Sequence, residues 1–524
     1  RFAAIGATRL KVLDPSAKAD QPLHHSDGRY HLVYNGEVYN FRELRRELVA
    51  LGETFVTDGD TEVVLAACVR WGVDAFRRFN GMWALGFVDA VERAGFLCRD
   101  RFGVKPLVYV VDGKSVAFAS EVRALTQIGN WDRTLDQDSV TEHLVFGYIA
   151  DPATIYRRAR RLPPGHYLTF DRHGVGEPRR HYDIPAPPPL ASHEYADART
   201  HVRHELGEAV IRRRVSDVPI GAFLSGGLDS SIVVAHLSAA LGRPVQTFSV
   251  GFAGQARYDE TRFARIAADR FGTEHHELIL TERDIVEAIP KILDHLGEPF
   301  GDSSIIPTSL LSQFAREHVT VALSGDAGDE LFGGYWRYLG HETLDAYRRI
   351  PRLLRRGAIE PLLAILGGSR SSMLGNRVRQ FRKLMRTDAA DPLARHVAWS
   401  RVLSPGAADT FTDPARASAC AERAAWGAKQ RTDAFGSADG LNRILAFDLQ
   451  HQLPADMLQK VDLASMMNSL EVRTPFLDPS VVELALAMPG EFKVRRGVRK
   501  RVLLDAYRGH LPDPILDRSK QGFE

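Results

Sequence analysis

The chain has 524 residues, too many for one ordinary domain of about 100–200 residues, so two or three domains are expected. Hydrophobic residues make up 44% and charged residues 26%, and 68 basic against 66 acidic side chains leave a formal charge of +2. This balance gives no electrostatic reason to expect nucleic acid or a membrane as a partner. No apolar run reaches about 18 residues, so no membrane span is expected.

Cysteine is rare in this sequence, with Cys68, Cys98 and Cys420 as its three examples. A disulfide scaffold is therefore not expected, and a reducing, cytoplasmic location fits best. The chain opens at Arg1 without a signal peptide and stops at a Lys-Gln-Gly-Phe-Glu run. We expect both ends to be cut.

Residues 1–182 predict an α+β domain with antiparallel sheets. The segment 31–40 alternates and is expected to turn at Asn35-Gly36. The segment 81–100 predicts two strands joined by a polar turn, and 107–120 predicts a hairpin around Asp112-Gly113. The intervening helices are expected at 41–52 and 61–72.

A proline-rich stretch at 183–190 can be neither a helix nor a central strand, and a linker is therefore expected at 183–197. Beyond it, residues 198–524 predict a second domain. Short apolar strands alternate there with helices, which indicates a parallel sheet with helices on both faces. The strands are expected at 220–225, 246–252, 275–280 and 320–325, and the chain is expected to be mainly helical after about residue 340.

The strongest local signal is the run Ser-Gly-Gly-Leu-Asp-Ser-Ser at 225–231. It follows an apolar strand and opens a helix, where backbone N–H groups and the helix dipole favour an anion. Its two glycines would let the backbone approach phosphate oxygens, while Ser225 and Ser230 add hydroxyls. The run is not a Walker loop, since no Gly-Lys-Ser/Thr follows. A plain strand-to-helix turn is the alternative.

Asp229 would repel a phosphate unless a cation stood between them. Mg²⁺ commonly bridges carboxylates and substrate phosphates, so a second acid is expected nearby. The turn at 325–330 supplies one, again at the carboxyl end of an apolar strand. We expect Asp329 to be the second metal ligand. Alternatively, these acids only cap the following helix.

Taken with the runs at 323–335 and 462–478, the 225–231 run resembles the glutamine-dependent asparagine synthetases, which belong to the ATP pyrophosphatases. The resemblance extends to the segments 35–41, 59–65, 99–107 and 119–125 of the first half. It implies an αββα sandwich of the N-terminal-nucleophile hydrolase type followed by an adenine-nucleotide alpha-hydrolase-like sheet. The implied reaction makes β-aspartyl-AMP and pyrophosphate from aspartate and ATP, after which ammonia displaces AMP.

The resemblance also assigns roles to residues of the second half. Pyrophosphate and metal would be held by Ser225, Gly226, Gly227, Asp229 and Ser230, with Asp329 joining Asp229 at Mg²⁺. Leu224, Val250, Ser324 and Gly325 would contact the adenosine, and Asp326 would be a polar group near the intermediate.

A distal lysine, Lys500, would meet the charge that grows on pyrophosphate. Alternatively, Lys500 is one more solvated charge in a basic stretch. Lys520 would be a second phosphate contact. Asp462 and Arg473 would face the acyl-acceptor site. Arg473 could pair with a substrate carboxylate or, equally, form an ion pair in the core.

In the first half, the resemblance implies that Arg9 holds the glutamine carboxylate and that Gly59 and Asp60 bind its amine. Asn35 and Gly36 would form the oxyanion hole, unless they are only a hairpin turn. In this family type a cysteine at the mature N-terminus attacks the glutamine amide. Residue 1 is Arg, and Cys68 and Cys98 are expected in the core. We favour a missing N-terminal strand over a degenerate glutaminase, because the glutamine-site residues match.

The expected partners are thus ATP, Mg²⁺, aspartate and glutamine or ammonia. A homodimer is left open. The rival function is a related amide-forming enzyme, a β-lactam synthetase or a peptide macrolactam cyclase, with a degenerate glutaminase half. The run at 469–478 favours aspartate over these rivals. A non-catalytic scaffold is the alternative from another class, and Asp229, Asp329 and Lys500 argue against it.

Overall fold

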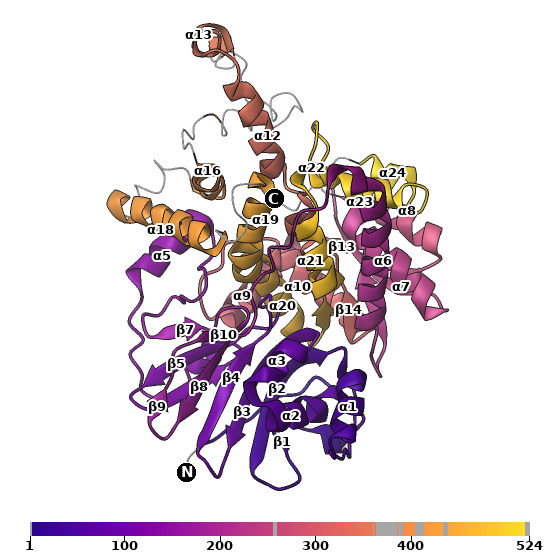
Figure 1. The fold of residues 1–524 in the computed structure, drawn as a ribbon. Coiled ribbons are helices and arrows are strands. Elements are labelled where there is room, and N and C mark those ends of the chain that lie inside the picture. The colour runs from indigo at the N-terminus through magenta and orange to yellow at the C-terminus, as the bar shows by residue number, and fades with distance from the viewer. Residues whose placement is uncertain are drawn as a thin grey trace.

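The computed structural model describes residues 3–254, 259–359, 361–362, 385, 391–403, 413–432 and 439–518. Two regions can be followed in Figure 1: antiparallel strands near the N-terminus, and a helix-rich region above them. No helix in the described ranges is both long and apolar enough to cross a membrane.

Two antiparallel sheets make up the N-terminal region. The larger has the order β1-β2-β3-β4-β8-β10 with β9 beside β8, and the smaller has the order β6-β5-β7. The larger sheet contains β1 (Leu23–His24), β2 (Tyr30–Val38), β3 (Gly81–Asp89), β4 (Ala94–Arg99), β8 (His166–Asp171), β9 (Gly174–Val175) and β10 (Arg179–Arg180). The smaller contains β5 (Val108–Asp112), β6 (Ser115–Ala119) and β7 (Ala159–Arg161). The helices of this region are α1 (Phe41–Ala50), α2 (Asp60–Trp71), α3 (Ala75–Arg78), α4 (Val122–Leu125) and α5 (Gln137–Phe146).

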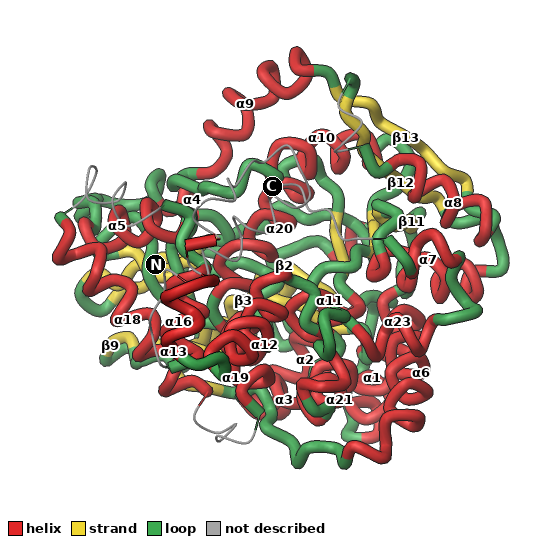
Figure 2. The backbone as a smooth tube through the Cα atoms, turned by 90° about the horizontal axis from the view of Figure 1, so that it is seen from above, coloured by secondary structure: helices red, strands yellow, loops and turns green. Residues whose placement is uncertain are grey.

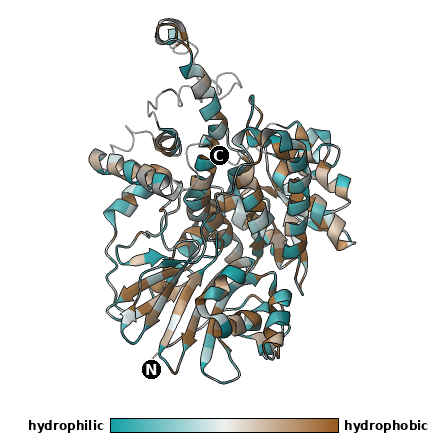
Figure 3. Cartoon of the chain, in the orientation of Figure 1, coloured by the Kyte–Doolittle hydropathy of each residue, from teal (hydrophilic) through white to brown (hydrophobic). Residues whose placement is uncertain are grey.

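The helices and the two sheets form four layers, because successive side chains on a strand point to opposite faces of its sheet. Trp83 on β3 shares a core with α1 and α2, whereas its neighbour Ala84 packs with Tyr109 on β5 in a core between the two sheets. On the outer face of the smaller sheet, Val110 packs with Leu125 of α4. The expected αββα sandwich is therefore confirmed, and hydrophobic residues gather along its strands (Figure 3).

The second region is built on a five-stranded parallel sheet of order β13-β12-β11-β14-β15. Its strands are β11 (Ile220–Phe223), β12 (Gln246–Phe252), β13 (Glu274–Leu280), β14 (Val321–Leu323) and β15 (Glu471–Arg473). One face packs on α6 (Tyr195–Arg213), α7 (Leu228–Leu241), α8 (Thr261–Phe271), α21 (Pro479–Ala487) and α23 (Arg501–Tyr507). The other packs on α10 (Ile305–Arg316) and α20 (Gln459–Met466), so helices cover both faces as predicted.

The remaining helices of the described residues lie beside the parallel sheet and over the N-terminal strands (Figure 2). They are α9 (Glu282–Leu296), α11 (Gly328–Phe332), α12 (Trp336–Arg348), α13 (Arg352–Leu354), α16 (Pro392–Trp399), α18 (Pro414–Thr432), α19 (Gly440–Gln450), α22 (Gly490–Lys493) and α24 (Asp513–Leu516). A π-helical turn at Leu453–Leu458 leads into α20. The proline-rich stretch 183–190 forms neither helix nor strand, as its composition predicts.

One expectation about local structure is wrong, and one strand was not predicted. Asn35 and Gly36 do not turn the chain, because both lie inside β2, where they pair with Ala84 and Trp83 of β3. The dipeptide has the composition of a hairpin turn, but Gly36 serves another purpose: a Cβ there would lie 2.1 Å from the carbonyl oxygen of Met82. The strand β15 was also not anticipated, since three residues are too few to show a period.

Candidate active site

The predicted phosphate loop, residues 225–231, connects β11 to the N-terminus of α7. Gly226 has a φ of +67°, and a Cβ at this position would lie 2.3 Å from backbone atoms of Phe263 and Ala264. Only glycine fits both the backbone angle and the close approach to α8. The loop is therefore pressed against a neighbouring helix, with its N–H groups at the start of a 14-residue helix where an anion is favoured.

Hydrogen bonds within the loop fix the hydroxyl groups of Ser225 and Ser230. The Ser225 hydroxyl accepts a hydrogen bond from the Gly227 N–H at 3.2 Å and lies 3.1 Å from the Ser230 hydroxyl. Leu224, just before the loop, is fully buried, and its N–H donates to the Phe248 carbonyl of β12 at 2.8 Å. The loop and the neighbouring strand that carries Val250 are thus tied together at the carboxyl edge of the sheet.

A second turn, residues 324–330, follows β14, which is the next strand in the sheet. It packs directly on the first turn. A Cβ at Gly325 would lie 2.8 Å from the Asp229 Cβ, and one at Gly328 would lie 2.7 Å from the Asp229 Cγ. The N–H of Ser324 donates to the Arg473 carbonyl at 2.9 Å. Glycine at these two positions brings the turns, and their acids, into one site.

The two aspartates of these turns meet at a single cation. The Lys500 Nζ lies 2.6 Å from an Asp329 oxygen and is also hydrogen-bonded to Asp229. Lys500 comes from the N-cap of α23 and is 6% exposed. Burial alone would lower the pKa of Lys500, but the two aspartates together hold it above its ordinary value. The site therefore places two carboxylates around one positive centre.

Asp326, on the second turn, lies near another group of charged side chains, which contains Lys460, Asp302 and Asp456. The Ser324 hydroxyl donates to the Asp326 carboxylate at 2.7 Å. Burial raises the pKa of Asp326, although the Ser324 hydrogen bond and the nearby charge of Lys460 act against this. Lys460, which is buried on α20, donates to Asp302 at 3.1 Å. Burial and the charge of Asp302 raise the pKa of Asp456 to about 6, against the opposing charge of Lys460.

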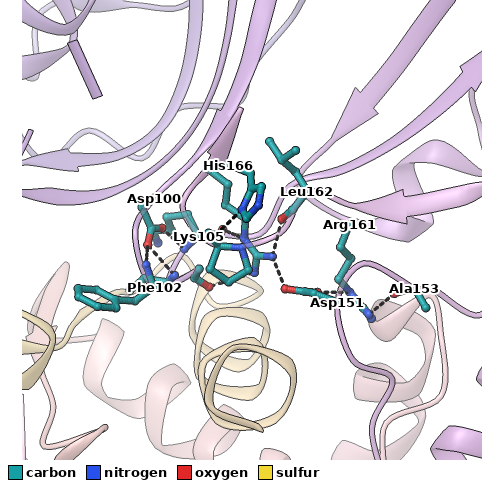
Figure 4. A network of polar contacts seen from close by, with 12 residues as sticks. Asp100, Phe102, Lys105, Asp151, Ala153, Arg161, Leu162 and His166 are labelled. Atoms are coloured by element: carbon teal, nitrogen blue, oxygen red, sulfur yellow. Dashed lines mark hydrogen bonds and ion pairs between the residues drawn. The ribbon is translucent and has the colours of Figure 1, made fainter. Parts of the chain in front are cut away.

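Asp462 does not join this group. Its carboxylate forms an ion pair at 2.9 Å with Lys105 of the N-terminal region, and both side chains are buried. The loop that presents Lys105 is held by Asp100, whose carboxylate accepts N–H groups of Phe102 and Lys105 at 3.0 and 2.9 Å (Figure 4). The Lys105–Asp462 ion pair thus connects the two regions.

Arg473 is also engaged away from the phosphate loop. Its Nε donates to Glu471 at 2.8 Å, and its Nη1 donates to the carbonyl oxygens of Arg213 and Val215 at 2.8 and 2.6 Å. A second terminal nitrogen lies 3.6 Å from Glu37 of β2. With the side chain completely buried, these are the contacts of the core ion pair that the sequence left open. Lys520 lies outside the described residues.

The residues assigned to glutamine lie in two connected places of the N-terminal region. Arg9 donates to the carbonyl oxygens of Leu13 and Asp14 at 2.6 and 2.7 Å. The same segment faces Gly59, where a Cβ would lie 3.4 Å from the Asp14 Cβ. Gly59 is the N-cap of α2, which begins at Asp60. The 13–14 segment therefore connects Arg9 to the start of α2, where Gly59 and Asp60 lie.

Asp60 is joined in turn to the strand that carries Asn35 and Gly36. Its carboxylate accepts hydrogen bonds from the Tyr34 hydroxyl at 2.8 Å and from the Val38 N–H at 2.9 Å. Burial raises the pKa of Asp60 to about 6, although these two bonds act against it. Cys68 and Cys98 are both buried, as expected for core residues.

Comparison with known proteins decides the family of this chain. The family model described as asparagine synthase matches residues 201–524, and the glutamine amidotransferase domain model matches residues 2–182.

The chain belongs to the asparagine synthase family.

Among its relatives is "Asparagine synthetase [glutamine-hydrolyzing] 1" of Bacillus subtilis, which is 31% identical over 526 residues, covering 99% of this chain and 79% of the relative. "Asparagine synthetase [glutamine-hydrolyzing] 3" of the same organism is 29% identical, with the same two coverages.

Four charged residues around this asparagine synthase-family site were not predicted from the sequence: Asp302, Asp456, Lys460 and Arg518. Lys460 lies two residues before the run at 462–478, and its spacing of four from Asp456 could have placed both on one helix face. Arg518 donates to the Ser225 carbonyl at 3.3 Å, contacts Glu260, and covers the Phe263 ring at 4.4 Å. Nothing in the local sequence distinguishes Arg518 from other basic residues near the end of the chain.

Proposed function

We propose that this chain makes asparagine from aspartate, ATP and a nitrogen donor, either glutamine or free ammonia, and releases AMP and pyrophosphate. The observation that carries the proposal is the meeting of Asp229, Asp329 and Lys500 beside the glycine-rich loop. Membership of the asparagine synthase family and relatives named as glutamine-hydrolysing asparagine synthetases support it.

In the proposed reaction, an oxygen of the aspartate β-carboxylate attacks the α-phosphorus of ATP. The bond from that phosphorus to the bridging oxygen breaks, and its electron pair leaves with pyrophosphate. N–H groups of the loop at 225–231 would hold the departing phosphates, and Lys500 would offset their growing charge. Ammonia then attacks the acyl carbon, AMP leaves with the electrons of the C–O bond, and the nitrogen loses a proton.

We assign a Mg²⁺ ion to Asp229 and Asp329. Their carboxylates already surround one positive group, and two carboxylates plus phosphate oxygens are a common ligand set for this ion. Within the described ranges, no group of three or more His, Cys, Asp or Glu side chains could hold a metal ion. A metal at this pair would therefore take its other ligands from the nucleotide and water. When bound, it would supply positive charge at the phosphates.

We place the amino-acid end of aspartate among Asp326, Lys460, Asp302 and Asp456. This group adjoins the Asp329 turn. It contains one ammonium and three carboxylates, so its net charge is negative. An amino acid brings an α-ammonium for the acids and an α-carboxylate for Lys460. The π-helical turn that carries Asp456 supports a functional role, since such turns are frequent at functional sites.

We assign the glutamine site to Arg9, Asn35, Gly36, Gly59 and Asp60. Asp60 offers a carboxylate for the glutamine amine, and its raised pKa leaves it ionised above about pH 6. Arg9 is held by the 13–14 segment beside Gly59 and offers a guanidinium for the glutamine carboxylate.

The proposal is tested by exchange of labelled pyrophosphate into ATP. Exchange should require L-aspartate and should not occur with L-glutamate or without an acid. Exchange with a different acid alone would move the function to another amide-forming synthetase, and no exchange with any acid would refute adenylation.

The metal assignment has its own variant. Asp229→Asn should lower exchange by at least about a hundredfold with the fold intact, because metal charge stabilisation is worth several kcal/mol. The matched control is Asp294→Asn, since the Asp294 side chain is 88% exposed on α9. Near-normal exchange by Asp229→Asn would contradict the assignment.

A further inference from the structure

Lys500 occupies the point where two acids from different turns converge. Asp229 lies in the first turn of α7, Asp329 in the first turn of α11, and Lys500 at the N-cap of α23. The lysine contacts both carboxylates, with the Asp329 contact at 2.6 Å. The three side chains are 18%, 17% and 8% exposed. One ammonium therefore offsets one of the two negative charges of a largely buried carboxylate pair.

The backbone around this contact is shaped to keep the lysine there. A Cβ at Gly334 would lie 1.7 Å from an Asp329 oxygen and 2.2 Å from the Lys500 Cε. Lys500 itself has a φ of +51°, a left-handed angle that a residue with a side chain rarely adopts. The adjacent Arg499 donates instead to the Gly334 carbonyl at 2.8 Å. The fold thus tolerates strain to aim Lys500 at the pair.

An uncompensated carboxylate pair in a buried site would strongly destabilise the protein. Without nucleotide and metal, Lys500 supplies the positive charge between Asp229 and Asp329. The divalent ion of the proposed function would bind the same two carboxylates. A metal ion bound between these carboxylates would lie close to the Lys500 ammonium, and the two positive charges would repel each other.

We propose that Lys500 is the built-in counter-ion of the Asp229–Asp329 pair and competes with the divalent cation for it. Metal binding displaces the ammonium from the carboxylates, which frees Lys500 for the phosphates. The lysine consequently keeps the metal affinity of the nucleotide-free protein low and makes metal binding depend on the nucleotide. This inference rests on the metal assignment of the proposed function.

The test is a titration of the full chain with Mn²⁺ in the absence of nucleotide and amino acid. Binding is measured from the electron paramagnetic resonance signal of the free Mn²⁺. The wild type should bind weakly. Lys500→Met should bind Mn²⁺ at least about tenfold more tightly, because its side chain has no ammonium to compete with the metal for the two carboxylates. Lys500→Arg should stay close to the wild type, and Lys500→Met combined with Asp229→Asn should lose the gain. Lys291→Met, an exposed lysine on α9, controls for net charge.

An unchanged Mn²⁺ affinity in Lys500→Met, or an equal gain in Lys291→Met, would overturn the inference. If Lys500→Met is unstable, Lys500→Gln offers an amide that can still donate to a carboxylate. Mn²⁺ should then raise the unfolding temperature of either variant and leave that of the wild type unchanged. Failure of Mn²⁺ to rescue both variants would also overturn it. Because no acid or ATP is present, these results are independent of pyrophosphate exchange.

Discussion

At the scale of single residues, burial changes what a carboxyl group can do near neutral pH. Asp456 lies on the π-helical turn beside Lys460, with its carboxylate accepting a hydrogen bond from Gln452 at 3.2 Å. Burial is the main reason that its pKa rises to about 6. An ordinary aspartate would be ionised throughout the physiological range, whereas Asp456 changes charge within it.

This shift predicts a pH-dependent affinity for the amino-acid substrate. Below about pH 6 Asp456 is protonated and cannot pair with the α-ammonium, so the KM for aspartate should fall as pH rises through about 6. Asp456→Asn should show a KM about tenfold higher that no longer varies between pH 5.5 and 8. The measurement is pyrophosphate exchange at varied aspartate and saturating ATP.

The control for this experiment is the KM for ATP, which Asp456→Asn should leave unchanged. Asp294→Asn should keep the wild-type pH profile. If Asp456→Asn retained that profile, the titration would belong to another group and Asp456 would not contact the substrate.

At the scale of elements, the phosphate loop depends on one glycine more than on any of its hydroxyls. Gly226 combines a positive φ with close approach to the backbone of α8, which cannot give way as a flexible side chain would. Gly242, at the other end of α7, has a similar φ of +63° but open space around its Cβ position. A comparison of substitutions at the two glycines therefore distinguishes the effect of backbone strain from the effect of steric contact.

Gly226→Ala should raise the KM for ATP at least about tenfold and lower the unfolding temperature, because the loop must move off α8. Gly242→Ala should cost only the left-handed strain of about 1–2 kcal/mol and exchange pyrophosphate normally. The measurements are exchange at varied ATP and calorimetric unfolding. Equal effects of the two substitutions would show that the contact with α8 is unimportant.

The elements also show what local sequence can and cannot predict. The parallel strands and the phosphate loop were foreseeable because apolar runs, glycines and helix starts occur within a few residues of each other. Gly36 was misread because a glycine for close strand approach and a glycine for a turn look alike in sequence. The strand β15 forms only because β14 is beside it.

At the scale of the whole molecule, buried ion pairs join the N-terminal sandwich to the parallel-sheet region. Lys105 pairs with Asp462 across 357 residues of sequence, and Arg161 pairs with Glu298. The Arg473 guanidinium lies 3.6 Å from Glu37. Such partners could not be predicted from local pattern. Asp462 was therefore expected to face the acyl-acceptor site, and Arg473 was left open between a substrate carboxylate and a core ion pair. Their charges are already matched within the protein.

The Lys105–Asp462 pair predicts how the two regions depend on each other. Asp462→Asn leaves the ammonium of Lys105 buried without its counter-charge, which should lower the free energy of unfolding by about 3–5 kcal/mol. Replacing both residues, with Lys105→Met and Asp462→Leu together, should cost less than the single change, because no uncompensated charge remains. Calorimetric unfolding of the full chain measures both.

The exposed pair between Arg283 and Glu287 supplies the comparison, since Glu287→Gln removes a pair whose side chains are 84% and 61% exposed. Its unfolding temperature should match the wild type, because exposed pairs contribute little. If Asp462→Asn were as stable as Glu287→Gln, Lys105 would have to find another partner or lose its proton. If the double replacement were the least stable variant, the pair would be stabilising in itself, and the contact between the two regions would depend on it.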